Sequence, residues 1–391
     1  MVQQEVLYRQ TVVVVLCNQQ TTGTRYVHAQ VHTVQEVYRT TRSTTFFFPS
    51  YPSSSSLFNQ HLYKLRSIAP TKMDKAALLV LFALPLSVAF LNPASRKRFI
   101  SRLSSSPTTL DPQTIKSLNG KSAVLTGASS GLGRSLAILL ADCNLKHLVL
   151  SGRNVDALEE VKAACEGINK SNEVHVLPCD LSDIDSSAAF AQIALETCEN
   201  NIDLLVLNGG MSSRSSFLDT NITVDQLLMN VNYLSGAAIS KGIVPSMVSR
   251  KSGAIVWISS VQGKIGTPFR TSYAASKFAV QGYCEALRSE LASSGVTVHC
   301  VSPGYINTNL SKNAATGDGS KHGKLDEATA NGAEPSDVAG EILDKVITSG
   351  ESDFLVAATV SAKAAIALKF LAPHFLEKKL VKRFVKASKE K

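Results

Sequence analysis

The stretch Thr126-Gly127-Ala128-Ser129-Ser130-Gly131-Leu132-Gly133 decides the fold of this chain. It directly follows the apolar, strand-like run Ala123 to Thr126, and we expect a helix to begin after it at Arg134. Glycines in such a turn let the backbone approach a pyrophosphate closely, and free N–H groups at the start of the helix stabilise its charge. The sequence therefore predicts a strand, a dinucleotide-binding turn and a helix in succession.

Short apolar runs continue to alternate with helical stretches beyond this turn. Buried strands that are separated by helices are typical of a parallel sheet with right-handed crossovers. We therefore predict an α/β fold with a Rossmann-type, doubly wound parallel sheet, in a single domain over residues 118–356. The further strand candidates are His147 to Ser151, Val174 to Pro178, Leu204 to Asn208, Ala254 to Ser259, Val296 to Val301 and Phe354 to Val356.

Charge is distributed unevenly along the 391 residues. Lys and Arg outnumber Asp and Glu by 14 to 4 in residues 1–121 and by 9 to 2 in residues 362–391, whereas residues 122–361 hold 17 basic and 25 acidic side chains. A nucleic-acid-binding domain would carry its positive charge on the folded part, so we expect no nucleic-acid partner. The basic flanks are typical of targeting or membrane-contact segments, or of solvated tails.

The seven cysteines contain no C-x-x-C pair. This pattern indicates neither a disulfide framework nor a zinc site, and we expect no metal ligands among the site residues. We expect most of these cysteines to be ordinary buried thiols, which favours a reducing compartment for the domain.

Two segments precede the domain. Residues 1–72 alternate Val, Gln, Thr and Tyr without a helical period, so we expect an unstructured extension, or one that precedes the true start of the protein at Met73. Residues 73–107 combine an apolar run, Ala76 to Leu91, with a basic, serine-rich stretch. The run is shorter than the ~20 residues that cross a bilayer as a straight helix, and it suits a signal peptide or a membrane anchor. We expect an endoplasmic reticulum membrane location, or a plastid reached by a signal and transit peptide.

The segment after the domain, residues 357–391, interleaves apolar and basic side chains at roughly helical spacing. Such an amphipathic helix suits the surface of an anionic membrane, or a face on a partner protein. A membrane surface is therefore an expected partner. Within the domain, the loop Asn307 to Pro335 follows a strand end and has little periodicity, which favours a lid.

The stretch Tyr273-Ala274-Ala275-Ser276-Lys277 carries the chemistry that we expect. On a helix, residues four apart share one face, so the phenol of Tyr273 and the ammonium of Lys277 can act together. A tyrosine with a pKa near ~10 is a poor base at neutral pH, and a neighbouring cation lowers that pKa by stabilising the phenolate.

With these two motifs the chain resembles the short-chain dehydrogenase/reductase family, over about residues 120 to 350. The glycine-rich turn resembles the family's T-G-x-x-x-G-x-G motif, and Tyr273 with Lys277 resembles its Y-x-x-x-K motif. Ser260 lies 13 residues before Tyr273, which is the family's spacing for its catalytic serine. Asn232 matches the helix asparagine of its tetrad. The resemblance implies that Asn232, Ser260, Tyr273 and Lys277 are the catalytic residues.

The resemblance also implies a mechanism. NADPH would deliver a hydride to the substrate carbonyl carbon, Ser260 would hydrogen-bond the carbonyl oxygen, and Tyr273 would donate the proton. Lys277 would lower the pKa of Tyr273 and bind the nicotinamide ribose, and Asn232 would position a water that relays protons to Lys277.

Cofactor choice is indicated at the end of the second predicted strand, where Ser151-Gly152-Arg153 lacks a carboxylate and offers a guanidinium. A basic side chain there favours a 2′-phosphate, and hence NADP(H). Gly209 departs from the family's N-A-G motif, which has alanine at that position. The cofactor-binding residues that the resemblance implies are Gly127, Ser129, Ser130, Gly131, Leu132, Gly133, Arg153, Asp180, Leu181, Asn208, Gly209, Gly210, Tyr273, Lys277, Pro303, Gly304, Ile306 and Thr308.

Three further stretches, Val231 to Gly236, Ile258 to Lys264 and Glu285 to Leu291, are most similar to the membrane-associated dehydrogenase/reductase member 7B and 11β-hydroxysteroid dehydrogenase group. This similarity implies a small apolar carbonyl or alcohol substrate, lipid-like or steroid-like. The family also implies a homodimer, formed through the helical stretches 226–248 and 271–294.

Two other functional classes compete with this hypothesis. A catalytically inactive dinucleotide-binding scaffold would normally have a broken tetrad, and all four positions are present here. An NAD-dependent epimerase or dehydratase on the same fold usually has a G-x-x-G-x-x-G turn, whereas this chain has G-x-x-x-G-x-G.

Overall fold

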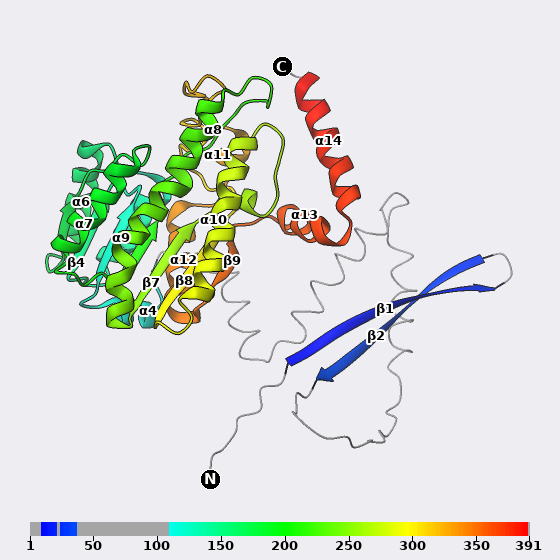
Figure 1. Cartoon of the computed structure of the whole chain (residues 1–391), viewed down its shortest axis with the longest axis horizontal. Helices are drawn as coiled ribbons and strands as arrows, with labels where there is room; N and C mark the ends of the chain where they lie inside the picture. Colours follow the sequence, from blue (N-terminus) through cyan, green and yellow to red (C-terminus); the bar gives the residue numbers. More distant parts are fainter. Residues whose placement is uncertain (1–8, 22–23, 37–108, 390–391) are drawn as a thin grey trace, which may run out of the picture. The chain divides into compact units, whose positions relative to one another are not determined.

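The computed structural model describes residues 9–21, 24–36 and 109–389 (Figure 1), in two compact units, residues 1–75 and 76–391. The first unit contains an antiparallel hairpin of β1 (Arg9–Thr21) and β2 (Thr24–Glu36). These two strands lie within the extension of residues 1–72, whose alternating Val, Thr, Gln and Tyr also suits the two-residue period of a strand. The predicted signal or anchor segment, residues 73–107, lies outside the described residues.

The second unit contains a seven-stranded parallel sheet with the order β5-β4-β3-β6-β7-β8-β9. The chain passes from one side of β3 to the other between β5 and β6, so a crevice opens at the carboxyl ends of the strands. The predicted doubly wound sheet is confirmed, and each predicted strand is present within two residues of its expected ends. The strands are β3 (Ser122–Thr126), β4 (His147–Ser151), β5 (Glu173–Val176), β6 (Leu204–Leu207), β7 (Gly253–Ile258), β8 (Val296–Pro303) and β9 (Asp353–Val356).

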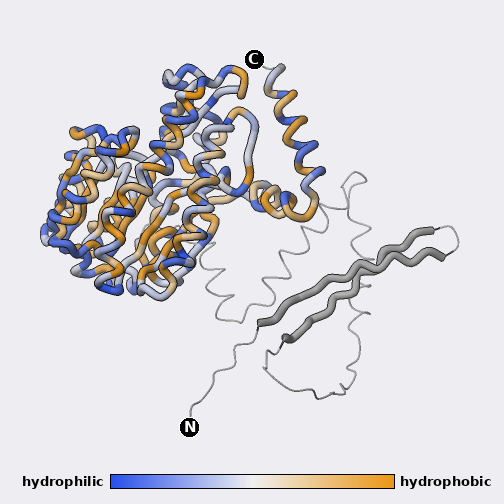
Figure 2. Tube along the Cα trace, in the orientation of Figure 1, coloured by the Kyte–Doolittle hydropathy of each residue, from blue (hydrophilic) through white to orange (hydrophobic). Residues whose placement is uncertain are grey.

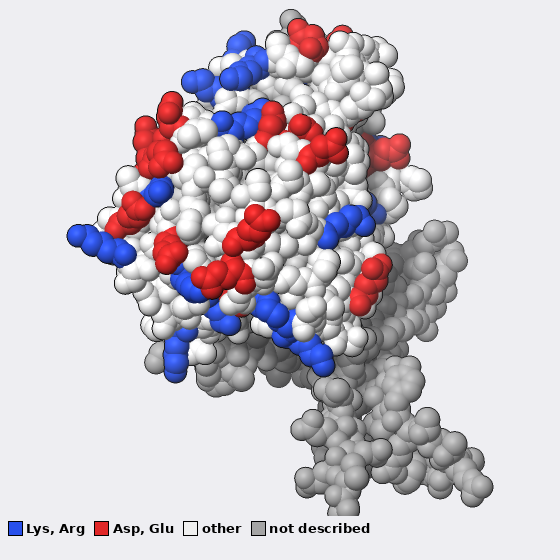
Figure 3. All heavy atoms as spheres, turned by 60° about the vertical axis from the view of Figure 1, so that its left-hand side comes forward, with Lys and Arg blue, Asp and Glu red and all other residues white. Residues whose placement is uncertain are grey.

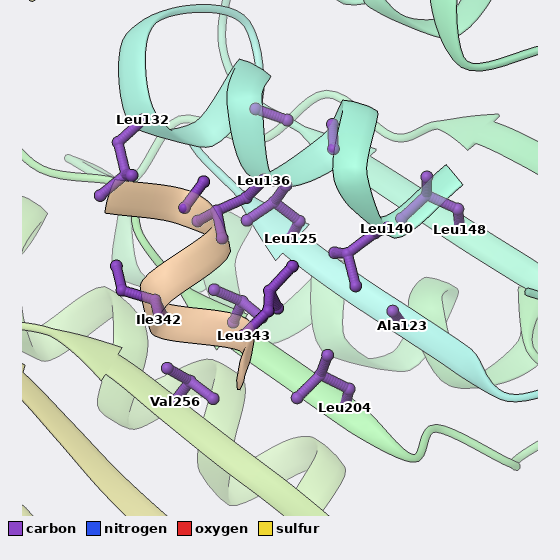
Figure 4. Packing of buried hydrophobic residues seen from close by; sticks show 14 of the residues in the cluster. Ala123, Leu125, Leu132, Leu136, Leu140, Leu148, Leu204, Val256, Ile342 and Leu343 are labelled. Atoms are coloured by element: carbon purple, nitrogen blue, oxygen red, sulfur yellow. The ribbon is translucent and has the colours of Figure 1, made fainter. Parts of the chain in front are cut away.

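Helices cover both faces of this sheet. On β3, Leu125 packs on the face covered by α5 (Gly131–Ala141), α6 (Val155–Ile168) and α12 (Pro335–Asp344). Figure 4 shows Leu125 between Leu136 and Leu140 of α5 and Ile342 and Leu343 of α12. The neighbouring residue Val124 packs on the opposite face, because successive strand residues point to opposite sides. That face is covered by α7 (Ile184–Thr197), α9 (Ser235–Arg250) and α10 (Thr271–Glu290).

Shorter elements lie around this frame. The helix after the glycine-rich turn begins at Gly131, three residues before the predicted start at Arg134, because the Arg134 N–H already donates to the Ser130 carbonyl oxygen. The predicted lid, residues 307–335, contains one short helix and isolated bridges to other loops. The remaining helical segments are α4 (Pro112–Leu118), α8 (Ile222–Met229), a π-helical turn (Asn230–Leu234), a 3-10 turn (Val261–Gly263), α11 (Glu327–Ala330) and a second π-helical turn (Lys345–Ser349).

The C-terminal residues form two further helices, α13 (Val360–Leu371) and α14 (Pro373–Lys389). Apolar and hydrophilic residues alternate along α14 in Figure 2. Leu376 is buried, and the Phe384 ring stacks on Phe269 with 5.2 Å between centroids.

Among the described helices, none combines the length and the apolar character needed to cross a membrane. On the face shown in Figure 3, acidic and basic side chains are intermixed.

Candidate active site

The glycine-rich turn joins β3 to α5 in a backbone conformation that only glycine tolerates well. Gly127 and Gly131 have positive φ angles of +65° and +53°. A Cβ atom at Gly127 would lie 2.7 Å from the Gly209 Cα atom, and one at Gly133 would lie 2.0 Å from the Gly127 carbonyl oxygen. Ser130 caps α5 without a side-chain hydrogen bond to the helix. The turn therefore offers an open helix N-terminus to an anionic group.

Asn208, at the end of β6, holds this turn in place. Its Nδ2 donates to the carbonyl oxygens of Thr126 and Gly127, at 3.0 and 3.1 Å. The backbone N–H groups of Asn208 and Gly209 both donate to Thr126 Oγ1. A Cβ at Gly209 would lie 2.3 Å from Leu181 Cδ1, so Leu181 occupies the space that the family's alanine would need. Asn208 thus supports the cofactor turn through the neighbouring strand.

Arg153 and Asp180 follow β4 and β5 at the same edge of the sheet. Asp180 accepts hydrogen bonds from the N–H and the hydroxyl of Ser182, at 3.0 and 2.9 Å. Burial raises the pKa of Asp180, but these hydrogen bonds and the charge of Arg153 outweigh it and lower the pKa. The exposed Arg153 guanidinium therefore lies near the predicted adenosine contact, where it is free to meet a phosphate.

Residues after β8 close the site from the other side. A Cβ at Gly304 would lie 2.2 Å from the Ala357 carbonyl oxygen, so the chain turns tightly directly after Pro303. The Thr308 side chain faces the glycine-rich turn, since its Cγ2 would lie 3.0 Å from a Cβ at Gly131. Ile306 forms a bridge with Ala333 of the predicted lid. These residues lie at the same edge of the sheet as the glycine-rich turn.

Tyr273 and Lys277 lie on the first turns of α10, and both are buried, with 7% and 4% of their surface exposed. Lys277 Nζ donates to the Ile258 carbonyl oxygen at 2.8 Å and lies 5.9 Å from the centre of the Tyr273 ring. Ser260 follows β7, and its side chain forms a hydrogen bond with Tyr273. The structure therefore brings these three predicted residues together.

Asn232 lies in the π-helical turn, a local widening of the helix that is frequent at functional sites. Its Oδ1 accepts from the Met211 N–H at 2.8 Å, and its Nδ2 donates to the Met211 carbonyl oxygen and to Ser276 Oγ at 2.9 and 2.8 Å. A Cβ at Gly210 would lie 3.0 Å from Asn232 Oδ1 and 3.4 Å from Lys277 Nζ. The amide of Asn232 and the ammonium of Lys277 therefore face one small space.

Burial shifts the pKa values of both titratable residues of the pair. Burial lowers the pKa of Lys277 to about 8, because the charged ammonium loses solvation. Burial also raises the pKa of Tyr273, while the hydrogen bond with Ser260 and the charges of Arg214 and Arg270 oppose the rise. Tyr273 therefore keeps its proton at neutral pH, and Lys277 changes its charge close to physiological pH.

Arg214, Arg270 and Asp326 were not predicted from the sequence, although the charges of both arginines act on Tyr273. Asp326 Oδ2 accepts from Arg214 Nε at 2.8 Å and from Arg270 Nη2 at 3.1 Å. Only 11% and 12% of the two arginine side chains are exposed. The three residues are far apart in the sequence, with Arg270 56 positions after Arg214, so no motif marks them. Two cations therefore share one carboxylate next to the phenol.

Comparisons with known proteins agree with this architecture. A profile of the short chain dehydrogenase family matches residues 121–319. The chain belongs to this family. It is 46% identical over 268 residues to a dehydrogenase/reductase SDR family protein 7-like of Anopheles gambiae, which covers 67% of this chain and 83% of the relative. It is 42% identical over 270 residues to dehydrogenase/reductase SDR family member 7B of Mus musculus, with coverage of 68% and 82%.

A solved structure shares the fold of this chain. It is described as an NAD(P)-dependent gluconate 5-dehydrogenase of Beutenbergia cavernae with bound NADP, at low occupancy. The TM-score is 0.52 with 28% sequence identity, and the match covers 61% of this chain and 96% of that chain. These matches show the fold and the oxidoreductase class of the chain. They also show the resemblance to member 7B that the sequence motifs indicate.

Proposed function

We propose that this chain interconverts a carbonyl and a secondary alcohol with NADP(H) as cofactor, and that Tyr273 acts as the general acid and base. The observation that carries the proposal is the buried group of Ser260, Tyr273 and Lys277 beside the glycine-rich turn. An inactive scaffold would have no need to keep an ammonium and a phenol together in a buried pocket, where the charge costs free energy.

In this mechanism the bound NADPH supplies the hydride. Ser260 holds the carbonyl oxygen against the Tyr273 hydroxyl, which donates its proton as negative charge develops on that oxygen. Lys277, protonated below about pH 8, stabilises the phenolate that remains. Asn232 fixes the loop at Met211 and α10 around this group, and we propose that a water between its amide and Lys277 relays the proton. The reverse sequence oxidises the alcohol.

Cofactor preference rests on Arg153. The segment Ser151-Gly152-Arg153 contains no acidic side chain. The exposed Arg153 guanidinium lies close enough to Asp180 to lower the pKa of that carboxyl group. We expect Arg153→Ala to weaken NADPH binding ~10- to 100-fold, the value of one or two charge-assisted hydrogen bonds, and to leave NADH nearly unchanged. Equal losses for both cofactors, in a fluorescence titration, would contradict this preference.

The arginine pair narrows the substrate class. Within the described part of the chain, Arg214 and Arg270 share the single carboxylate of Asp326 and are largely shielded from solvent, and the nearby charge of Arg383 also acts on Arg270. An unbalanced buried charge is costly, so an anion from the substrate would be stabilised there. We propose an apolar, lipid-like carbonyl substrate with an acidic group near the reacting carbon. The exposed Phe217 and Leu218 offer apolar surface for its chain.

The test is a comparison of paired long-chain ketones, one neutral and one with a carboxylate or phosphate near the carbonyl, by NADPH consumption. We expect the acidic ketone to be preferred, and Arg214→Gln to reduce kcat/KM for it ~10-fold or more, while the neutral ketone is little affected. If the protein prefers the neutral ketone and Arg214→Gln does not change this preference, only the proposed acidic group of the substrate is contradicted. NADPH binding without turnover of any ketone or alcohol would favour the inactive scaffold.

Two partners belong to the same proposal. The basic, amphipathic α14 suits an anionic membrane surface, at the endoplasmic reticulum. A second copy of the chain suits the groove between α9 and α10, which is lined in part by Val244, Val248 and Leu287. Co-sedimentation with vesicles that contain phosphatidylserine tests the first, with the double variant Lys378→Glu and Lys379→Glu as the control. Light scattering tests the second.

A further inference from the structure

Three potential metal ligands meet at the amino edge of the sheet, the edge opposite the candidate active site. His147 is the first residue of β4, and Glu173 and His175 lie at the start of β5. The parallel register pairs His147 with Glu173, and residues two apart on a strand project from the same face. The fold therefore places one imidazole beside a carboxylate and a second imidazole.

The distances between these groups suit a small divalent ion. His147 Nδ1 lies 3.3 Å from His175 Nε2 and 3.3 Å from Glu173 Oε2, and His175 Nε2 lies 3.9 Å from the same oxygen. Bonds of about 2.0–2.2 Å to zinc place neighbouring ligands of a tetrahedron roughly 3.3–3.6 Å apart. An ion therefore fits between the three atoms with only small shifts of the exposed Glu173.

The surroundings of His147 also suit a metal ligand. Its side chain is only 4% exposed, and its Nε2 has no hydrogen-bond partner among the described residues. Glu199, two residues after the end of α7, places Oε1 3.7 Å from this nitrogen and is itself held by Lys146. A metal on Nδ1 would leave the proton on Nε2, where it faces Glu199. Metal-bound histidines commonly have such a carboxylate behind them.

We propose that His147, Glu173 and His175 bind one divalent transition-metal ion, with zinc as the best match, and that Glu199 orients His147 from behind. Two imidazoles and a carboxylate favour zinc, nickel or copper over magnesium and calcium, which prefer oxygen ligands alone. A water would complete the tetrahedron, because the Glu173 side chain is 64% exposed and the site opens to solvent.

The role of this site is to hold the edge of the fold together. A metal there would link the starts of β4 and β5 and, through Glu199, the end of α7. The five residues of β4 span roughly 16 Å, so the ion lies far from the cofactor turn at the other end of the strands. Metal binding should therefore stabilise the protein without supplying any step of the reaction.

Metal-stripped, full-length protein would be titrated with zinc chloride and followed by calorimetry and thermal unfolding. We expect about one zinc ion per chain, and a rise in the unfolding midpoint of ~5–10 °C when free zinc exceeds the Kd about 100-fold. Magnesium chloride should produce neither effect. X-ray absorption at the zinc edge should show nitrogen and oxygen ligands.

Two variants test the assignment of ligands. His175→Ala and Glu173→Gln replace side chains that are partly exposed, so the fold should persist, and both should abolish the zinc-dependent stabilisation. His374→Ala is the matched control, because His374 is 94% exposed and also lies next to a glutamate, Glu377. NADPH turnover should be the same with and without zinc. Sulfur ligands, absence of stoichiometric binding, or binding that survives both variants would overturn the proposal.

Discussion

The two edges of the parallel sheet gather their polar groups in different ways. At the carboxyl edge, loops and helix starts bring in Asn208, Ser260, Tyr273 and Lys277, and each is fixed by hydrogen bonds to backbone or to another side chain. At the amino edge, strand register alone places His147 beside Glu173 and His175, and His147 Nε2 has no hydrogen-bond partner among the described residues. The first edge is organised in advance, whereas the second would be completed by a ligand.

This difference has a physical basis. Groups that transfer a proton must keep their geometry before the substrate arrives, so the protein satisfies their hydrogen bonds itself. A metal site needs only unprotonated ligands at suitable distances, because the ion supplies most of the remaining free energy. Variants at the two edges should therefore affect different measurements, turnover at one and metal-dependent stability at the other.

The largest effect is expected for Tyr273→Phe at the carboxyl edge. The variant removes the proposed proton donor, so kcat should fall ~10²- to 10⁴-fold, the usual contribution of a general acid. NADPH binding should persist, because the ring still fills the same buried site. Steady-state turnover and a fluorescence titration of NADPH measure the two effects. A variant with near-normal kcat would remove Tyr273 from the mechanism.

The sequence predicted most of the carboxyl edge because that edge is encoded by local motifs. The glycines of the turn lie close to one another in the sequence, and so do Tyr273 and Lys277. Their spacing therefore shows that the glycines share one turn and that Tyr273 and Lys277 share one helix face. The seven strands were found because buried parallel strands are short and continuously apolar. Nothing local, however, indicates the π-helical turn that carries Asn232.

Groups that depend on register or on long loops could not be found in this way. Arg214 and Asp326 are 112 residues apart, and His147 and His175 are 28 apart. Cysteine spacing says nothing about histidines on neighbouring strands. Only the order and register of the strands show that these side chains meet.

The second prediction contrasts two glycines at the carboxyl edge. In Gly133→Ala the new methyl group would meet the Gly127 carbonyl oxygen, a backbone atom that cannot move away, so the free energy of unfolding should fall by ~1–3 kcal/mol. NADPH binding should be lost with it. In Gly209→Ala the methyl group meets the flexible end of Leu181, so the loss should stay below ~1.5 kcal/mol. Urea unfolding and NADPH titration measure both, and equal losses would show that the turn is not constrained by its backbone.

The third prediction concerns pH. The pKa of Lys277 is lowered to about 8, so the residue is a cation at pH 7 and loses its proton as the pH rises through 8. The phenolate left after proton transfer then loses its stabilising charge, and kcat/KM for reduction should fall ~10-fold between pH 7 and 9. Lys277→Arg should shift this fall to higher pH, because a guanidinium stays protonated. The exposed Lys116→Met is the control, and the same profile in both variants would exclude Lys277 as its source.

The smallest effect is expected at the amino edge, for His175→Ala in protein stripped of metal. His175 is half-buried, its Nε2 lies 3.3 Å from His147 Nδ1, and its pKa is lowered first of all by burial. The free energy of unfolding should change by less than ~1 kcal/mol, the value of one modest hydrogen bond, and turnover should not change. Added zinc should then enlarge the difference between the variant and the unmodified protein. If the metal-free variant is already destabilised by several kcal/mol, the amino edge is organised in advance like the carboxyl edge, and the contrast between the two edges fails.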